Sequence, residues 1–129
     1  MSEMQRVTVV NDSPEFLELM ADVLHDASYP ATVIDGDRDN ALELIEAAEP
    51  EILIIDLRLG SDGLHGMDIV RWARQHPQLS RVPTIICSAD RYGVEQVQEE
   101  LDAMSGVTVL MKPFSVDELY AALRELTPA

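Results

Sequence analysis

Four residues of types that bind phosphate or a metal ion stand at the ends of short apolar runs. Asp12 follows VTVVN, Asp56 ends ILIID, Ser88 follows TIIC and Lys112 follows VTVLM. A carboxylate at the end of such a run must emerge at the rim of a sheet, because burial of an unpaired charge is costly. Any one of these residues could simply cap a turn or be solvated, but four at different strand ends indicate a shared site.

The chemistry that these groups support is phosphoryl transfer. Two carboxylates ~4 Å apart repel by roughly 4 kcal/mol at an effective dielectric constant near 20, so Asp12 and Asp56 need a cation or a proton between them. Carboxylate oxygens favour Mg²⁺, which keeps several waters and readily bridges a phosphate. Lys112 could then neutralise a second phosphoryl oxygen, and the Ser88 hydroxyl could donate to a third. The set predicts in-line attack by Asp56 on a phosphoryl donor.

The elements that must position these groups alternate along the chain. Apolar residues at helical spacing separate five β-rich runs, which are expected to form strands at 6–10, 31–34, 52–56, 82–87 and 107–111. Four of the runs are almost uninterruptedly apolar, which is typical of strands covered on both faces. The pattern predicts an α/β domain with a doubly wound, five-stranded parallel (βα)5 sheet. In such sheets ligands bind beyond the carboxyl ends of the strands.

Two helix starts are marked by their sequence. Ser115 with Glu118 forms a predicted capping box, and Ser13 followed by Pro14 predicts an N-cap and a first helical residue.

Composition restricts the class of protein. The 129 residues, 47% of them apolar, fit one domain, and 9 basic against 24 acidic residues give a net charge of −15. This charge argues against direct binding to nucleic acid or an anionic membrane, and no segment approaches the ~20 apolar residues of a membrane span. The single cysteine, Cys87, is expected to be a buried structural thiol in a reducing compartment, so a cytoplasmic location is predicted.

The segments VVNDSPEF, ILIIDLRLG, IICSAD and VLMKPF, in this order, resemble the response-regulator receiver family of two-component signalling. The resemblance covers essentially the whole chain. It implies a stand-alone, CheY-like receiver domain over residues 1–129 with no effector domain, a flavodoxin-like fold and the strand order 2-1-3-4-5. It also implies that Asp56 is the phosphoacceptor and that Asp12, Asp56 and the backbone carbonyl of Arg58 bind Mg²⁺ or Mn²⁺.

The same resemblance assigns the remaining site positions. Ser88 matches the switch hydroxyl, Lys112 the lysine that contacts the phosphoryl group, and the bond from Lys112 to Pro113 a cis peptide. Asn11 stands where the family most often has an acid, which predicts weaker Mg²⁺ binding and altered dephosphorylation. Val109 stands where an aromatic switch residue is common, which predicts an atypical coupling to the output.

The loop after Asp56, RLGSDGLHG, is about two residues longer than the commonest family form and has Gly60 where proline is frequent. A change in loop mobility or in partner access is expected, and the sequence does not choose between them.

The resemblance also implies partners. The phosphoryl donor would be a sensor histidine kinase or a histidine phosphotransfer protein. The output would pass to a protein target through the face formed by the fourth helix, fifth strand and fifth helix, or to a second copy in a homodimer. No nucleic-acid or membrane partner is expected, and the only catalysis would be the domain's own phosphorylation and dephosphorylation.

Two alternative functions remain open at this point. A phosphorylation-independent, receiver-like adaptor would bind a partner without using the site. A phosphatase of the haloacid dehalogenase type would also use a strand-end aspartate, but it needs an acid two residues later, where this chain has Arg58.

Three further patterns predict no site. Asp35, Asp37, Asp39 and Glu46 match ligand positions of an EF-hand loop, but Asn40 replaces its glycine and the leading helix is missing. Three glycines, Gly60, Gly63 and Gly66, lack dinucleotide-binding spacing and are assigned to turn geometry. The histidines, His25, His65 and His76, show no metal-ligand spacing.

Overall fold

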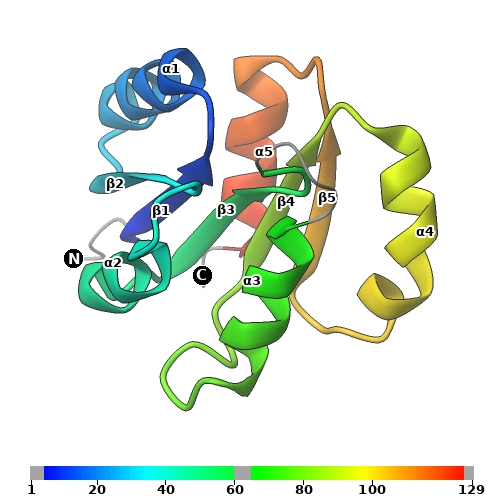
Figure 1. Ribbon diagram of the computed structural model, residues 1–129. Coiled ribbons are helices and arrows are strands. Elements are labelled where there is room, and N and C mark those ends of the chain that lie inside the picture. The colour runs from blue at the N-terminus through cyan, green and yellow to red at the C-terminus, as the bar shows by residue number, and fades with distance from the viewer. Residues whose placement is uncertain (1–4, 60–64, 127–129) are drawn as a thin grey trace.

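The computed structural model describes residues 5–59 and 65–126, and within these ranges strands and helices alternate throughout. The strands are β1 (Val7–Asn11), β2 (Ala31–Asp35), β3 (Ile52–Asp56), β4 (Thr84–Ser88) and β5 (Val107–Met111). The helices are α1 (Pro14–Asp26), α2 (Ala41–Ala48), α3 (His65–Gln75), α4 (Arg91–Asp102) and α5 (Val116–Leu126). The five strands form one parallel sheet in the order β2-β1-β3-β4-β5, which confirms the predicted doubly wound topology (Figure 1).

Three strands were predicted wrongly by one or two residues, and of these β2 only extends one residue further than expected, to Asp35. Strand β4 begins at Thr84 rather than at residue 82, because Pro83 has no N–H to donate to a neighbouring strand, although its carbonyl accepts from Leu53 N. Strand β1 is shifted by one residue and ends at Asn11. Both shifts bring a polar site residue, Asn11 or Ser88, into the last position of a strand.

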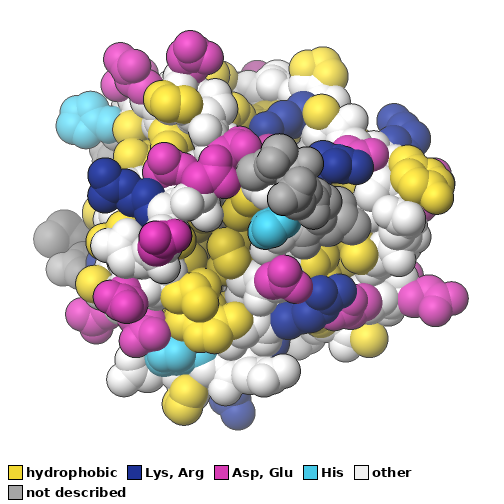
Figure 2. All heavy atoms as spheres, in the orientation of Figure 1, with side chains coloured by type: hydrophobic (Ala, Val, Ile, Leu, Met, Phe, Trp, Pro, Cys, Tyr) yellow, Lys and Arg dark blue, Asp and Glu magenta, His cyan; other side chains and the backbone are white. Residues whose placement is uncertain are grey.

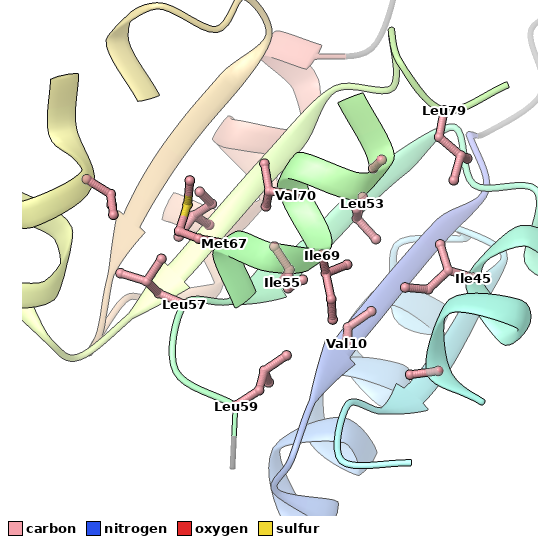
Figure 3. Packing of buried hydrophobic residues seen from close by; sticks show 14 of the residues in the cluster. Val10, Ile45, Leu53, Ile55, Leu57, Leu59, Met67, Ile69, Val70 and Leu79 are labelled. Atoms are coloured by element: carbon pink, nitrogen blue, oxygen red, sulfur yellow. The ribbon is translucent and has the colours of Figure 1, made fainter. Parts of the chain in front are cut away.

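Separate hydrophobic cores cover the two faces of the sheet. Because side chains alternate along a strand, Val9 and Ile54 pack under α1 and α5, whereas Val10 and Ile55 pack under α2, α3 and α4. In Figure 1 α3 lies in front of the sheet and α5 behind it. Figure 3 shows the core on the α3 side, where Met67 lies close to the central strands.

The edges of the sheet are less buried than the sequence predicted. Three central strands, β1, β3 and β4, are buried on both faces, apart from Asp56 at the end of β3. Four of the five residues of β2 are exposed, and every residue of β5 is partly exposed. The sequence predicted four strands that are covered on both faces, but only β1, β3 and β4 are. The edge strands β2 and β5 are less buried, because each has a neighbouring strand on one side only.

Both predicted helix starts are confirmed. The Ser115 hydroxyl accepts from Glu118 N at 3.0 Å, and the Glu118 carboxylate accepts from Ser115 N at 3.2 Å. At α1 the Ser13 hydroxyl accepts from Phe16 N at 3.3 Å, with Pro14 as the first helical residue. Local side-chain to backbone bonds thus fix where the helices next to the sheet edge begin.

Acidic side chains are distributed over the whole of the face drawn in Figure 2, with basic side chains between them. This distribution fits a solvated acidic surface rather than a single charged site. In the described residues no helix is long and apolar enough to cross a membrane. Asp35 ends a strand instead of following a helix, and no cluster of three acidic, histidine or cysteine side chains that could hold a metal occurs in the described part. The EF-hand reading therefore has no support.

Candidate functional site

The Asp56 carboxylate is the centre of the site. Strand β3 ends at Asp56, at the carboxyl edge of the sheet, and the side chain is 13% exposed. Three donors reach its oxygens: Lys112 Nζ at 2.9 Å and Asn11 Nδ2 at 3.1 Å on Oδ2, and Arg58 N at 2.9 Å on Oδ1. The charge that the sequence predicted to emerge at the rim is therefore largely enclosed and held by hydrogen bonds.

Asn11 is held on two sides. Its side chain lies at the end of β1, is 2% exposed, and accepts at Oδ1 from Ser13 N at 2.8 Å. Because Oδ1 is committed to this backbone donor, the amide nitrogen must face Asp56. An aspartate here would have no hydrogen to donate and would place a second buried negative charge beside Asp56.

Lys112 is placed by the residues on both sides of it. Its backbone N donates to Ser88 O at 2.7 Å, which ties the end of β5 to the end of β4. The ammonium lies over the Phe16 ring of α1, 4.2 Å from the ring centre. The Lys112–Pro113 peptide bond is cis, the isomer that the family resemblance implies.

Ser88 lies next to a second group of polar side chains. Its hydroxyl accepts from Asp90 N at 3.0 Å, and Asp90 in turn accepts from Arg58 Nε at 2.6 Å. These residues, together with Asp56 and Ala89, line a cavity of about 420 Å³. The hydrogen bond from Gly93 N, followed by that from Arg58, holds the pKa of the Asp90 carboxyl below its usual value of 3.8, so this residue is charged at neutral pH.

Cys87 is not a reactive group of this site. The side chain is fully buried, and burial, opposed by Lys112 and assisted by Asp56, raises the pKa of its thiol to about 12. A thiol with this pKa is neutral and unreactive at pH values near 7. The prediction of a buried structural cysteine is confirmed.

The donor set fits a magnesium ion. Asp12 directly follows β1, so its position is at the same sheet edge as Asp56, and the two residues offer carboxylate oxygens there. Mg²⁺ in proteins commonly uses one or two carboxylates plus waters and phosphate oxygens. A carboxylate offers about four acceptor positions, and three are used at Asp56, so one position remains for a cation.

Val109 packs in the sheet rather than at the site. It pairs with Ile86 of β4 and lies partly buried against the core on the α3 side. On α4, Val94 and Val97 are buried, whereas Tyr92 is 68% exposed. The apolar residues of this region therefore belong mostly to the core.

The structure adds two residues to the site that were not inferred from the sequence. Phe16 covers the ammonium of Lys112, and Asp90 pairs with Arg58 while capping α4. The DRY segment after Ser88 holds an N-cap signal at Asp90, but the pairing with Arg58 joins residues 32 positions apart.

Comparison with known proteins places this arrangement in a family. The model of the response regulator receiver domain matches residues 7–124. This chain belongs to that family. It is therefore a receiver domain of two-component signalling, a class of signalling domains that are generally not enzymes in the usual sense.

Curated relatives share the receiver region. The DNA-binding response regulator MtrA of Mycolicibacterium smegmatis is 34% identical over 121 residues, which are 93% of this chain and 49% of MtrA. The transcriptional regulatory protein BaeR of Escherichia coli is 28% identical over 127 residues, 94% of this chain and 47% of BaeR. The chain thus spans about half the length of these relatives.

Solved structures share the fold. CheY4 of Vibrio cholerae, a chemotaxis response regulator, superposes with a TM-score of 0.80 at 23% identity and covers 96% of this chain and 99% of its own. The receiver domain of the sensor histidine kinase PA1611 from Pseudomonas aeruginosa gives a TM-score of 0.75 at 23% identity, with 95% and 97% covered, and carries a magnesium ion in its active-site cleft. The predicted family and fold class are confirmed.

Proposed function

We propose that this receiver takes a phosphoryl group on Asp56 from a histidine kinase or histidine phosphotransfer protein, with Mg²⁺ or Mn²⁺, and signals by protein contact. The observation that carries the proposal is the enclosure of Asp56 by Lys112 and Asn11, beside a cavity that Ser88 also lines. A buried carboxylate with a lysine at 2.9 Å and open space next to it suits a nucleophile for phosphorus.

The transfer is a displacement at phosphorus. A lone pair of the Asp56 carboxylate forms the new P–O bond, the P–N bond to the donor imidazole breaks, and its electron pair returns to that imidazole. Lys112 already lies on Asp56 Oδ2 and can follow negative charge onto the phosphoryl oxygens. Ser88 accepts from Asp90 N, so its own hydroxyl hydrogen remains available to the phosphoryl group.

A divalent ion would be held by Asp12, Asp56 and the backbone carbonyl of Arg58. When bound it supplies charge neutralisation to the transferring phosphoryl group. Asn11 lies beside these ligands as a neutral residue, so the site has one negative charge fewer than an acid at this position would give. We therefore expect weaker binding of Mg²⁺ than with aspartate at this position.

Phosphorylation would be transmitted to a partner through a movement of the residues at the end of β4. Ser88 moves toward the phosphoryl group, and the segment from Ala89 to the start of α4 moves with it. The face formed by α4, β5 and α5 would carry the change to a protein target or to a second copy. Val109 has no ring to rotate, so the coupling would depend on the segment after β4.

A phosphorylation-independent adaptor is the second candidate. It is favoured by one observation: Asn11, Lys112 and Arg58 N satisfy the Asp56 carboxylate without any metal or phosphoryl group. The phosphatase alternative has no such support, because residue 58 is an arginine that pairs with Asp90.

Intact mass spectrometry after incubation with acetyl phosphate and Mg²⁺ separates the candidates. A single adduct of one phosphoryl group is expected, absent from Asp56→Asn and from samples with a metal chelator. Asp117→Asn, which alters an exposed carboxylate on α5, is the matched control and should still be phosphorylated. A protein that takes no phosphoryl group from acetyl phosphate or from a phosphorylated histidine protein would be an adaptor.

A further inference from the structure

The shortest ion pair among the described residues closes one side of the phosphorylation site. Arg58 Nε lies 2.6 Å from Asp90 Oδ2, and it joins the segment after β3 to the start of α4. The arginine side chain is 53% exposed and the aspartate side chain 22%. The pair is therefore accessible to a group that enters the cavity.

Asp90 makes three connections at this point. Its Oδ2 accepts from Arg58, its Oδ1 accepts from Gly93 N at 2.9 Å as the N-cap of α4, and its backbone N donates to Ser88 Oγ. Only the first of these involves Oδ2. The arginine could leave without removing the helix cap.

A phosphoryl group would change the balance of charge here. It carries about −1.5 to −2 charges near neutral pH. Among the described residues that line the cavity, Arg58 is the only one with a cationic side chain, and Asp90 adds a negative charge to the lining. While the pair is intact, Asp90 neutralises the positive charge of Arg58. A phosphoryl group in the cavity would then lie beside the negative charge of Asp90.

We propose that Arg58 binds the phosphoryl group on Asp56 and that it pairs with Asp90 as long as Asp56 is unphosphorylated. When Asp56 is phosphorylated, the guanidinium exchanges the Asp90 carboxylate for a phosphoryl oxygen, and Asp90 Oδ2 is released at the start of α4. This assignment rests on the proposed phosphorylation of Asp56. The exchange would give the aspartyl phosphate a second cation besides Lys112. It would also couple the site to α4, although position 109 holds a valine and not an aromatic residue.

The exchange is favourable because the two partners of the arginine differ in strength. An ion pair between partly exposed side chains contributes little, since solvent screens it. A guanidinium binds a doubly charged phosphoryl group more strongly, through two parallel hydrogen bonds. The bound arginine would also cover the phosphorus on its open side, which slows attack by water.

Two variants test the exchange through phosphoryl uptake and lifetime, followed by intact mass after acetyl phosphate is removed. Arg58→Ala should shorten the lifetime by about fivefold, because one charge-assisted contact is lost. Asp90→Asn should speed uptake by about threefold and leave the lifetime at least as long, since asparagine caps a helix as well as aspartate does. Arg91→Ala, which removes an exposed charge from the first residue of α4, is the matched control and should change neither.

A readout that a purely structural role would not move is the NMR signal of the Arg58 Nε–H group, assigned by its loss in Arg58→Lys. It should shift when the wild type is phosphorylated, and it should already differ in unphosphorylated Asp90→Asn. Equal lifetimes in wild type and Arg58→Ala, or slower uptake in Asp90→Asn, would overturn the exchange while phosphorylation itself stands. Absence of any adduct in the wild type would overturn the proposed function and the exchange together.

Discussion

The two sides of the Asp56 carboxylate are built differently. On the Oδ2 side, here the buried flank, Asn11 and Lys112 donate directly to the carboxylate, and their side chains are 2% and 25% exposed. On the Oδ1 side, the exposed flank, the donor among the described residues is the backbone N of Arg58, and the Arg58 side chain pairs with Asp90. The core thus fixes one flank, while solvent reaches the other.

This difference separates two tasks of the proposed phosphoacceptor site. A group that must be in place before the reaction benefits from a fixed position, because no reorganisation is then needed during the transfer. A group that transmits the reaction to the rest of the protein must instead be able to leave its partner in the unphosphorylated state and bind another one. The buried flank has the first property, and the exposed flank has the second.

Removal of Lys112 tests the buried flank most directly. Lys112→Ala should lower the rate of phosphoryl uptake by about 100-fold, because the preplaced positive charge that stabilises negative charge on the phosphoryl oxygens is lost. The measurement is the initial rate of adduct formation by intact mass at saturating Mg²⁺.

Lys112 is the only lysine in the chain, so the matched control removes an arginine. Arg124→Ala, exposed in the last turn of α5, should keep the wild-type rate. A loss of tenfold or less in Lys112→Ala would mean that the flanks contribute similarly.

The backbone that carries both flanks is tested at Gly66, one residue into α3. A Cβ atom there would lie 2.1 Å from the carbonyl oxygen of Asp56 and 2.8 Å from that of Leu57. Because backbone must move to make room, Gly66→Ala should lower the free energy of unfolding by about 2 kcal/mol, measured by urea denaturation.

Gly36→Ala is the matched control. Its added Cβ would meet Leu59 Cδ1 at 2.9 Å, and this atom belongs to a side chain rather than to the backbone. A smaller loss is expected there. An equal loss in both variants would show that the closeness of α3 to the Asp56 backbone does not matter for stability. The assignment of Gly66 to turn geometry in the sequence analysis missed this close approach, which depends on the packing of α3 against β3.

The contrast between the flanks also marks the limit of the sequence. Strand-end Asp56 and Lys112 and the cap at Ser115 follow from local patterns of two to four residues, whereas the order of the strands followed from the family resemblance. The donation from Asn11 to Asp56 and the pair between Arg58 and Asp90 depend on side-chain rotamers of residues 45 and 32 positions apart. Such contacts appear only when the strands are placed side by side.

Replacement of Asn11 by aspartate should sharpen the difference between the flanks. The amide donation to Asp56 would be exchanged for a repulsion between buried carboxylates, which a divalent cation relieves. Asn11→Asp should therefore unfold at a lower temperature without Mg²⁺ and bind Mg²⁺ about tenfold more tightly, in a site with one more negative charge. The half-life of the phosphoryl group should change as well.

Thermal unfolding at increasing Mg²⁺ concentrations measures the change in stability and in Mg²⁺ affinity. The decay of the phosphoryl adduct measures the change in half-life. Asp35→Asn, on the exposed edge strand β2 next to Asn11, serves as a nearby charge control. Unchanged metal affinity together with an unchanged half-life would contradict the role assigned to Asn11.

The smallest change in stability is expected from the ion pair between α3 and α4, whose side chains are partly exposed like those of the exposed flank. Arg71 donates to both carboxylate oxygens of Glu100, at 2.7 and 2.8 Å, and the side chains are 45% and 36% exposed. The hydrogen bond from Arg71 holds the pKa of Glu100 below its usual 4.5. A lowered pKa in the folded state stabilises the fold above the unfolded value, and this contribution disappears as the pH falls through the folded value.

Glu100→Gln should therefore lower the free energy of unfolding by about 0.5 kcal/mol near pH 7, where solvent screens the pair, and by nothing measurable near pH 3. Glu99→Gln, which removes the same charge from an exposed neighbour, should change stability less at neutral pH. A loss above about 2 kcal/mol would mean that α4 is rigidly fixed to α3. In that case release of Asp90 could not move the start of α4 easily, and the exposed flank would be as fixed as the buried one.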